Sequence, residues 1–211
     1  MESSTATPLR SSASFARLGG YAAILAALGS LLYSVAFVIL KSVVVYSVAL
    51  AAGGIVTTAI LTTIYFRVRE TDVAFALWAL LLGGVAALGS AAHGMFDLAT
   101  ALTPGLAPST PNVPSQIDAR GFLTFGLSGL ALFIFSLLIV RGGRLPRGLG
   151  YLGVVLGLLL MEIFLARLVV IDTTTTLGLA TIVGPAAIAG LLLNPIFNIW
   201  LGISLLRGAR S

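Results

Sequence analysis

The chain contains no cysteine, a single histidine and few charged residues. Without cysteine it can form no disulfide, no thiolate metal site and no cysteine nucleophile. Only 9% of its 211 residues are charged, against about 25% in ordinary soluble domains. Apolar residues take their place, because 58% of the chain is hydrophobic and the mean hydropathy is +1.10. This composition predicts an integral membrane protein.

Six apolar stretches are long enough to cross a bilayer. The hydrocarbon core is about 30 Å thick and a helix rises about 1.5 Å per residue, so a span needs about 20 residues. Only Lys41 and Ser42 separate the first two stretches, which predicts a very tight hairpin. The expected fold class is all-α, a polytopic bundle of six transmembrane helices. The stretches lie at about 18–40, 43–66, 73–100, 121–140, 148–171 and 178–206.

The basic residues predict how the chain is threaded. With six spans, nine arginines fall on one side, while Lys41 and Arg120 fall on the other and Arg167 lies within a span. Cytoplasmic segments carry an excess of Lys and Arg, so both termini are expected in the cytoplasm. The arginines stand singly or in pairs at the ends of apolar runs, so no nucleic-acid partner is expected. The nine are Arg10, Arg17, Arg67, Arg69, Arg141, Arg144, Arg147, Arg207 and Arg210.

Two segments outside the spans differ in composition from the rest. Residues 1–16 are rich in Ser, Thr and Ala, which predicts a disordered cytoplasmic tail. Residues 101–120 carry four of the eight prolines and form the one long external loop. This loop is either a lid over the outer helix ends or a mobile connector. Residues 17–211 are expected to form a single transmembrane domain.

Polar residues within the spans are the candidates for a site, because a charged side chain is costly in hydrocarbon. Glu162 lies about 22 Å from the cytoplasmic end of its span, counted at 1.5 Å per residue. Arg167 lies about 140° further around the same helix, so the two side chains do not share a face. The partner of Glu162 is therefore expected on another helix.

Asn194 is the expected partner of Glu162. It falls at a similar depth, and Pro195 breaks the helix after it and frees backbone groups. A carboxyl group facing a broken helix can form a binding site, or the groups can simply hold the helices together by hydrogen bonds. The ligand-binding candidates from this layer are Tyr33, Glu162, Asn194 and Asn198.

The histidine lies in the stretch AAHGMFDLA, four residues before an aspartate. His93 and Asp97 therefore share a helix face at the outer interface, within reach of Arg167. The three form either a structural latch or a proton or ligand site. No cofactor is expected. Zinc needs about three protein ligands, and Glu162 lies too deep to join His93 and Asp97 as the third. A single histidine excludes a bis-histidine haem, and the only lysine, Lys41, stands at a hairpin tip where it cannot hold retinal.

The stretches HGMFDLA, PSQIDARGFLTFGLSGL and RLPRGLGYLGVVLG resemble a family of bacterial six-span integral membrane proteins with no assigned activity. Its members carry an HG-x-x-D-L-A segment, a Pro-rich loop and a Leu-Pro-x-x-Leu-Gly start to the fifth span. The resemblance covers residues 85–160 and implies a multi-pass protein of a bacterial inner membrane. By position it points to His93, Gly94, Asp97, Asp118 and Gly121.

Three functions follow as hypotheses. The first is a small-molecule or lipid binder, with or without transport, whose polar site lies in the outer half of the bundle. The second is a structural or accessory subunit, in which the faces around Gly83 and Gly153 pack against a second copy or another membrane protein. The third is an intramembrane hydrolase that uses His93 and Asp97 as an acid–base pair. Enzymatic activity is thus left open, with binding favoured.

Overall fold

The computed structural model describes residues 13–103, 121–169 and 175–208. Within these ranges the regular structure is helical throughout, with no strand, and six helical segments are long and apolar enough to cross a membrane. The prediction of a six-span helical bundle is therefore confirmed. The elements are α1 (Ala13–Val38), α2 (Val43–Val68), α3 (Val73–Leu102), the π-helical η1 (Phe122–Leu127), α5 (Ser128–Gly142), α6 (Arg147–Val169), α7 (Thr176–Gly178), the π-helical η2 (Leu179–Val183), α8 (Gly184–Ala187), the π-helical η3 (Ile188–Leu193) and α9 (Asn194–Gly208).

The connections between spans are short where the structure describes them. The tight hairpin between α1 and α2 is confirmed, with Lys41 in the left-handed region at a φ of 52°. Asp72 caps α3 by accepting hydrogen bonds from two backbone amides of its first turn, each at 3.1 Å. Gly143 ends α5 with a φ of 67°, a conformation that favours glycine.

Two predicted segments fall partly or wholly outside the described residues. The first helix begins at Ala13, four residues inside the range predicted to be a disordered tail, while residues 1–12 are not described. The third helix runs to Leu102, and the Pro-rich loop, with its predicted role as lid or connector, lies in the range 104–120 that is not described.

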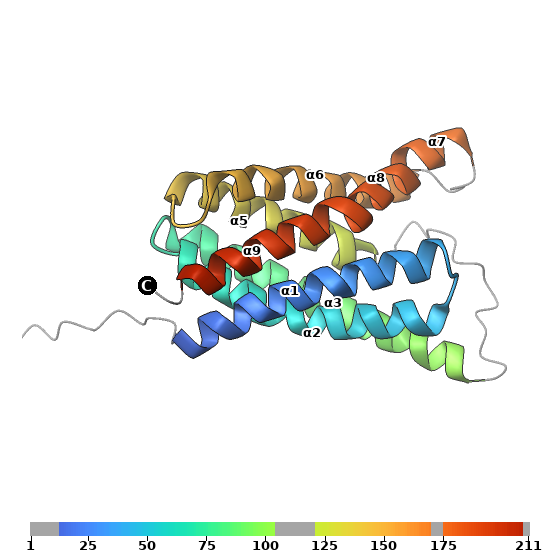
Figure 1. Ribbon diagram of the computed structural model, residues 1–211. Helices are drawn as coiled ribbons and strands as arrows, with labels where there is room; N and C mark the ends of the chain where they lie inside the picture. The colour runs from blue at the N-terminus through green and yellow to red at the C-terminus, as the bar shows by residue number, and fades with distance from the viewer. Residues whose placement is uncertain (1–12, 104–120, 170–174, 209–211) are drawn as a thin grey trace, which may run out of the picture.

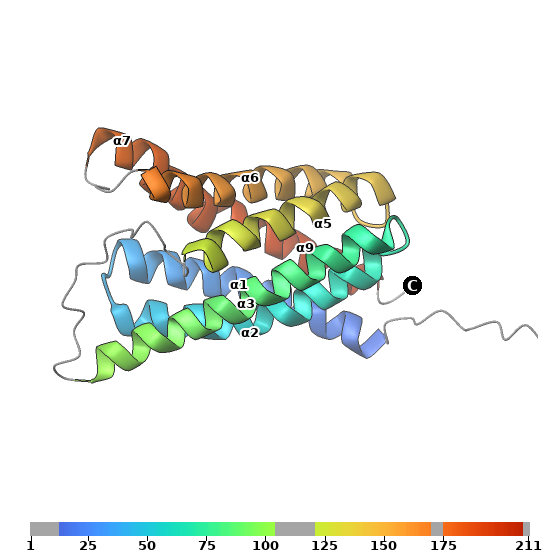
Figure 2. The same cartoon turned by 180° about the vertical axis from the view of Figure 1, so that it is seen from behind.

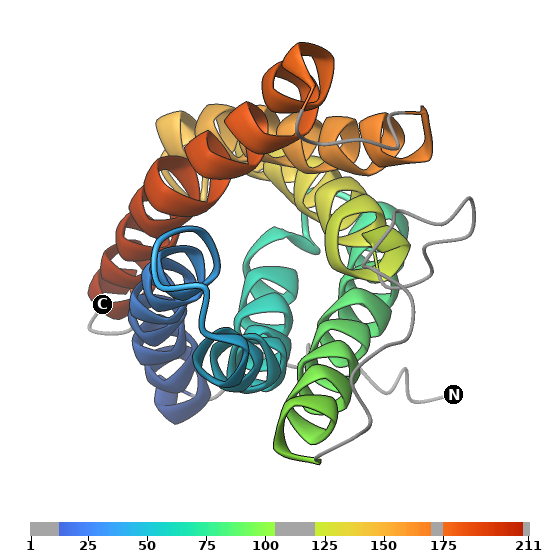
Figure 3. The ribbon, with the colours of Figure 1, turned by 90° about the vertical axis from the view of Figure 1, so that its right-hand side faces the viewer.

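The six spans form a closed ring. Each span packs against the next along the chain, as Figure 1 shows for α1 and α2 and Figure 2 for α3 between α2 and α5. The last span returns to the first, because α9 packs along α1. Viewed from the end that carries the α1–α2 hairpin, the helices surround a common centre (Figure 3).

Glycines allow the helices of the ring to approach closely. Gly20 of α1 and Gly202 of α9 face each other so closely that a Cβ on Gly202 would lie 2.7 Å from the Gly20 carbonyl oxygen. Gly54 packs in the same way against the backbone of α3. A Cβ on its neighbour Gly53, or on the similarly paired Gly84, would have no atom of another helix within 4 Å, so these two serve no helix contact. Each of the adjacent pairs Gly53–Gly54 and Gly83–Gly84 therefore contributes one packing residue.

The glycines predicted to seat a partner protein are used inside the chain. Gly83 of α3 packs against Leu61 of α2, and Gly153 of α6 packs against Ser136 of α5. Because small residues let helix backbones approach, these faces stabilise the ring itself.

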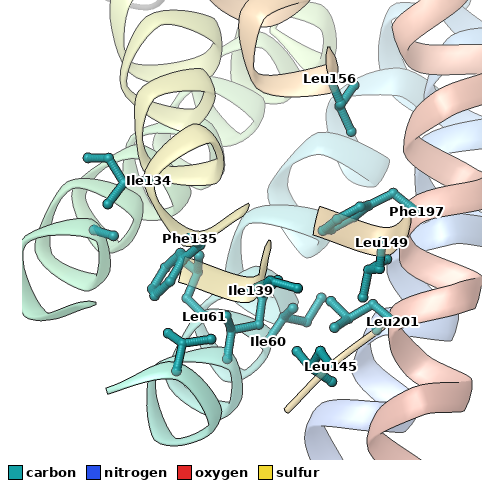
Figure 4. Close-up of a cluster of buried hydrophobic side chains, with 14 of the residues drawn as sticks. Ile60, Leu61, Ile134, Phe135, Ile139, Leu145, Leu149, Leu156, Phe197 and Leu201 are labelled. Carbon is teal, nitrogen blue, oxygen red and sulfur yellow. The ribbon is translucent and has the colours of Figure 1, made fainter. Parts of the chain in front are cut away.

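One end of the ring is filled by a dense apolar core (Figure 4). Phe135, Leu149 and Leu201 are fully buried there, each with 0% exposure. The same end carries the connectors 69–72 and 143–146, which are joined by an ion pair between Glu70 and Arg144. This is the end that the arginines predict to be cytoplasmic. His93, Asp97 and Arg167 lie toward the opposite end, which carries the α1–α2 hairpin.

The last span is irregular in its first half. Pro195 is the second residue of α9 and Pro185 the second residue of α8, so each proline follows a π-helical segment, η3 or η2, with one residue between. Proline lacks the N–H group and its ring clashes with the carbonyl one turn earlier, so wider π-helical turns form before it. The predicted helix break at Pro195 is thus seen as a local widening that leaves the span continuous.

Candidate functional site

The centre of the ring holds a cavity of about 520 Å³ to which all six spans contribute. This volume lies within the range of about 300–1,000 Å³ that is typical of small-molecule sites. Toward the predicted cytoplasmic end its walls are apolar and include Leu61, Phe135 and Phe197 (Figure 4). Beyond these the buried core closes the cavity. The residues that close it, all at most 2% exposed, are Leu138, Ile139, Leu149, Leu201 and Leu205.

The other half of the cavity is polar. It extends to Phe37 and Val38 at the end of α1, and thus to the end of the bundle that carries the α1–α2 hairpin. Six of the seven residues predicted for the site line this one cavity, and they come from four spans. They are Tyr33, His93, Asp97, Arg167, Asn194 and Asn198.

His93 and Asp97 form an ion pair along α3. The distance from His93 Nε2 to Asp97 Oδ2 is 3.2 Å, and the two side chains are 19% and 17% exposed. The other ring nitrogen, Nδ1, lies 3.4 Å from the Thr124 hydroxyl of η1. The imidazole is therefore oriented from both sides, by a carboxylate on its own helix and a hydroxyl on the next span. The next residue, Gly94, lets α3 approach α2 closely. A Cβ on Gly94 would lie 2.6 Å from the backbone nitrogen of Ala51.

Arg167 reaches the same polar zone from α6. Its guanidinium carbon lies 6.0 Å from the centre of the Phe125 ring, within the range of a cation–π contact. The Tyr33 hydroxyl is close enough to interact electrostatically with both Arg167 and Asp97. The predicted cluster of His93, Asp97 and Arg167 is thus brought to one cavity, with Tyr33 nearby.

Three aromatic rings line the cavity beside this cluster. Tyr33 and Phe37 stack on α1 with ring centres 5.8 Å apart. Tyr46 of α2 meets both rings edge-on, at 6.0 and 5.3 Å. Of the three, only Tyr33 was predicted from the sequence. Tyr46 could have been found from the hairpin, because it lies five residues after Lys41 and its contact partner Phe37 lies four residues before Lys41.

The two asparagines of the last span bind each other. The Asn198 Nδ2 group donates to the side-chain oxygen of Asn194 at 2.6 Å and to its backbone oxygen at 3.0 Å. Asn198 is buried, with 8% exposure. Because its carbonyl oxygen accepts from Asn198, the Asn194 amide offers its N–H donors to other groups.

Glu162 is the predicted site residue that the structure does not bring to the cavity. The wall contributed by α6 consists of Leu156, Leu160, Ile163 and Arg167. At 100° per residue, Glu162 lies about 130° around the helix from the centre of this stripe. Its expected partner Asn194 is engaged by Asn198 instead. The structure therefore separates Glu162 from the other six residues.

Comparisons of the chain with protein-family models, with curated proteins and with solved structures find no match. Among the residues that the structure describes, no three His, Cys, Asp or Glu side chains gather as metal ligands would. The cavity itself therefore carries the functional argument.

Proposed function

We propose that this membrane bundle binds a small amphipathic molecule inside its central cavity. The observation that carries the proposal is the division of the cavity into two halves. One half is apolar and closed by the buried core at the end with the Glu70–Arg144 ion pair. The other contains the side chains of Tyr33, His93, Asp97, Arg167 and Asn194, which come from four spans. An apolar ligand body fits the first half, and a polar head group fits the second.

The closed half favours binding over conduction. A pore needs a continuous path between the two faces of the membrane. Here the buried core, which includes Leu149 and Leu201 with 0% exposure each, fills one end of the ring. Ligand sites in helical bundles are typically apolar pockets with a few polar groups that fix the orientation of the ligand. His93, Asp97 and Arg167 supply such groups, and Thr124 fixes the histidine.

The test is native mass spectrometry of the chain released from lipid nanodiscs. Gly53 lines the cavity and has no atom within 4 Å of the place where a Cβ would lie, so the leucine side chain of Gly53→Leu should take up part of the cavity. Gly84→Leu makes the same chemical change at an equally open glycine that does not line the cavity.

We expect the wild-type chain and Gly84→Leu to retain a small ligand that Gly53→Leu loses. All three proteins should show the same thermal stability, which rules out unfolding as the cause. A wild-type chain released bare under the gentlest conditions would refute the proposal. So would a ligand that Gly53→Leu retains fully.

A further inference from the structure

We infer that the ligand is a single-chain amphiphile with an anionic oxygen head group, and that Arg167 binds this head group. The inference rests on the proposed function and names the chemistry of the ligand. It is carried by the charges and hydrogen-bond donors that line the polar half of the cavity.

The charged groups of the cavity wall favour an anion. Among the described residues that line it, one side chain is acidic, Asp97, and two can be cationic, His93 and Arg167. Asp97 lies against His93 at 3.2 Å, on the same helix. The Asp97 carboxylate thus has an imidazole beside it, and the guanidinium of Arg167 stays positively charged at any physiological pH. An anionic head group is attracted to this guanidinium, whereas a cationic one is repelled.

The neutral groups of the same wall add hydrogen-bond donors. Asn194 directs its carbonyl oxygen to Asn198 and therefore offers amide N–H groups. Tyr33 and Tyr46 bring phenolic hydroxyls from α1 and α2. A carboxylate, sulfonate or phosphate has only acceptor oxygens and fits such a set of donors.

Arg167 is the residue whose shape matches this head group. A guanidinium presents a planar fork of N–H donors that binds two oxygens of one anion at once. Its carbon lies 6.0 Å from the Phe125 ring centre, which helps to hold the fork at the cavity wall. The reduced dielectric constant of a protein interior strengthens such a pair relative to water.

The apolar half of the cavity indicates a single chain. The cavity as a whole has one polar end and one closed apolar end. A ligand with one head group and one tail places the head at the polar end and the tail at the closed end. Gly29 and Gly53 widen the space from α1 and α2, since both line the cavity and neither would place a Cβ within 4 Å of another atom.

The experiment compares three probes with the same dodecyl chain: dodecanesulfonate, dodecanol and dodecyltrimethylammonium. Their affinities are measured by calorimetric titration of the protein in phosphatidylcholine nanodiscs, and empty nanodiscs correct for partitioning into lipid. We expect dodecanesulfonate to bind about tenfold or more tightly than dodecanol, as a charge-assisted hydrogen bond implies.

Arg167→Gln should remove this preference and leave the affinity for dodecanol unchanged. Arg167→Lys should retain part of it, because the charge remains but the fork is lost. Arg207→Gln makes the same change in charge at the exposed C-terminal turn of α9, outside the cavity, and should behave as the wild type.

Equal affinities for dodecanesulfonate and dodecanol, tightest binding of the trimethylammonium probe, or an unaltered preference in Arg167→Gln would each overturn the inference. Displacement of dodecanesulfonate by phosphatidylglycerol in the nanodisc would overturn the assignment of a single chain. These outcomes leave the proposed function standing as long as dodecanol binds. If none of the three probes binds, the proposed function itself fails.

Discussion

Gly53 and Gly54 are adjacent glycines of α2, and the structure predicts opposite consequences for the same substitution. A Cβ on Gly54 would lie 2.7 Å from the backbone nitrogen of Ala91 and closer still to the carbonyl oxygen of Ala87. Ordinary van der Waals contact begins at 3.4 Å, so relieving the contact with Ala91 alone separates α2 and α3 by about 0.7 Å, and the closer Ala87 oxygen requires more, in a densely packed interface. Overpacking of this kind costs about 1–3 kcal/mol.

Gly53→Ala should change the free energy of unfolding by less than about 0.5 kcal/mol. Its Cβ would point into the open cavity, with no atom within 4 Å. The usual gain in helix propensity is small here, because spans stay helical in the unfolded state within the membrane. Gly54→Ala should lower the free energy by about 1–3 kcal/mol.

The assay is equilibrium unfolding of each variant in a titration with sodium dodecyl sulfate, followed by near-ultraviolet circular dichroism, which reports the tertiary packing of aromatic side chains. Equal destabilisation by both substitutions would refute the reasoning, since it would place both glycines in helix contacts. A neutral Gly54→Ala would show that α2 and α3 are not packed backbone to backbone at this point.

Two further predictions concern other parts of the molecule. Arg144→Ala should alter the free energy of unfolding by no more than about 1 kcal/mol in the same detergent titration. The reason is exposure, because the side chains of Arg144 and its partner Glu70 are 47% and 59% exposed. A larger loss would mean that the ion pair stabilises the fold. A membrane-impermeant maleimide applied to intact cells should label Ser42→Cys and not Arg147→Cys, and the reverse pattern would invert the predicted orientation.

The spans were predictable because hydropathy is a sum over neighbouring residues. Their number is right, and their ends differ from the helix ends by a few residues, as at Ala13 against the predicted start at residue 18. The rotation of each helix was not predictable in the same way, because the packing of its neighbours determines which face points inward. Gly53 and Gly54 are indistinguishable in sequence for this reason, although one lines the cavity and the other packs against α3.

The same limit explains the outcome for the site. Counting residues from the helix ends placed His93, Asp97 and Arg167 at a similar depth in the membrane. The spacing of four residues put His93 and Asp97 on one face of α3, and the similar depth of Arg167 on α6 predicted that it lies near them. Glu162 was chosen by depth and cost alone, without knowledge of the direction in which its face of α6 points. Asn194 found a partner one turn away in Asn198, on its own helix.

The seam between α1 and α9 has a consequence for how the protein is made. The other large contacts around the ring join spans that follow each other in the chain, so each can form as soon as the next helix enters the bilayer. The seam, where Gly20 meets Gly202, has to wait for the end of translation. Until then the nascent protein is an open arc with Tyr33 and His93 on its inner side. A ribosome stalled before residue 176 would leave this arc without the wall that the last span contributes, and the cavity would then be open to lipid.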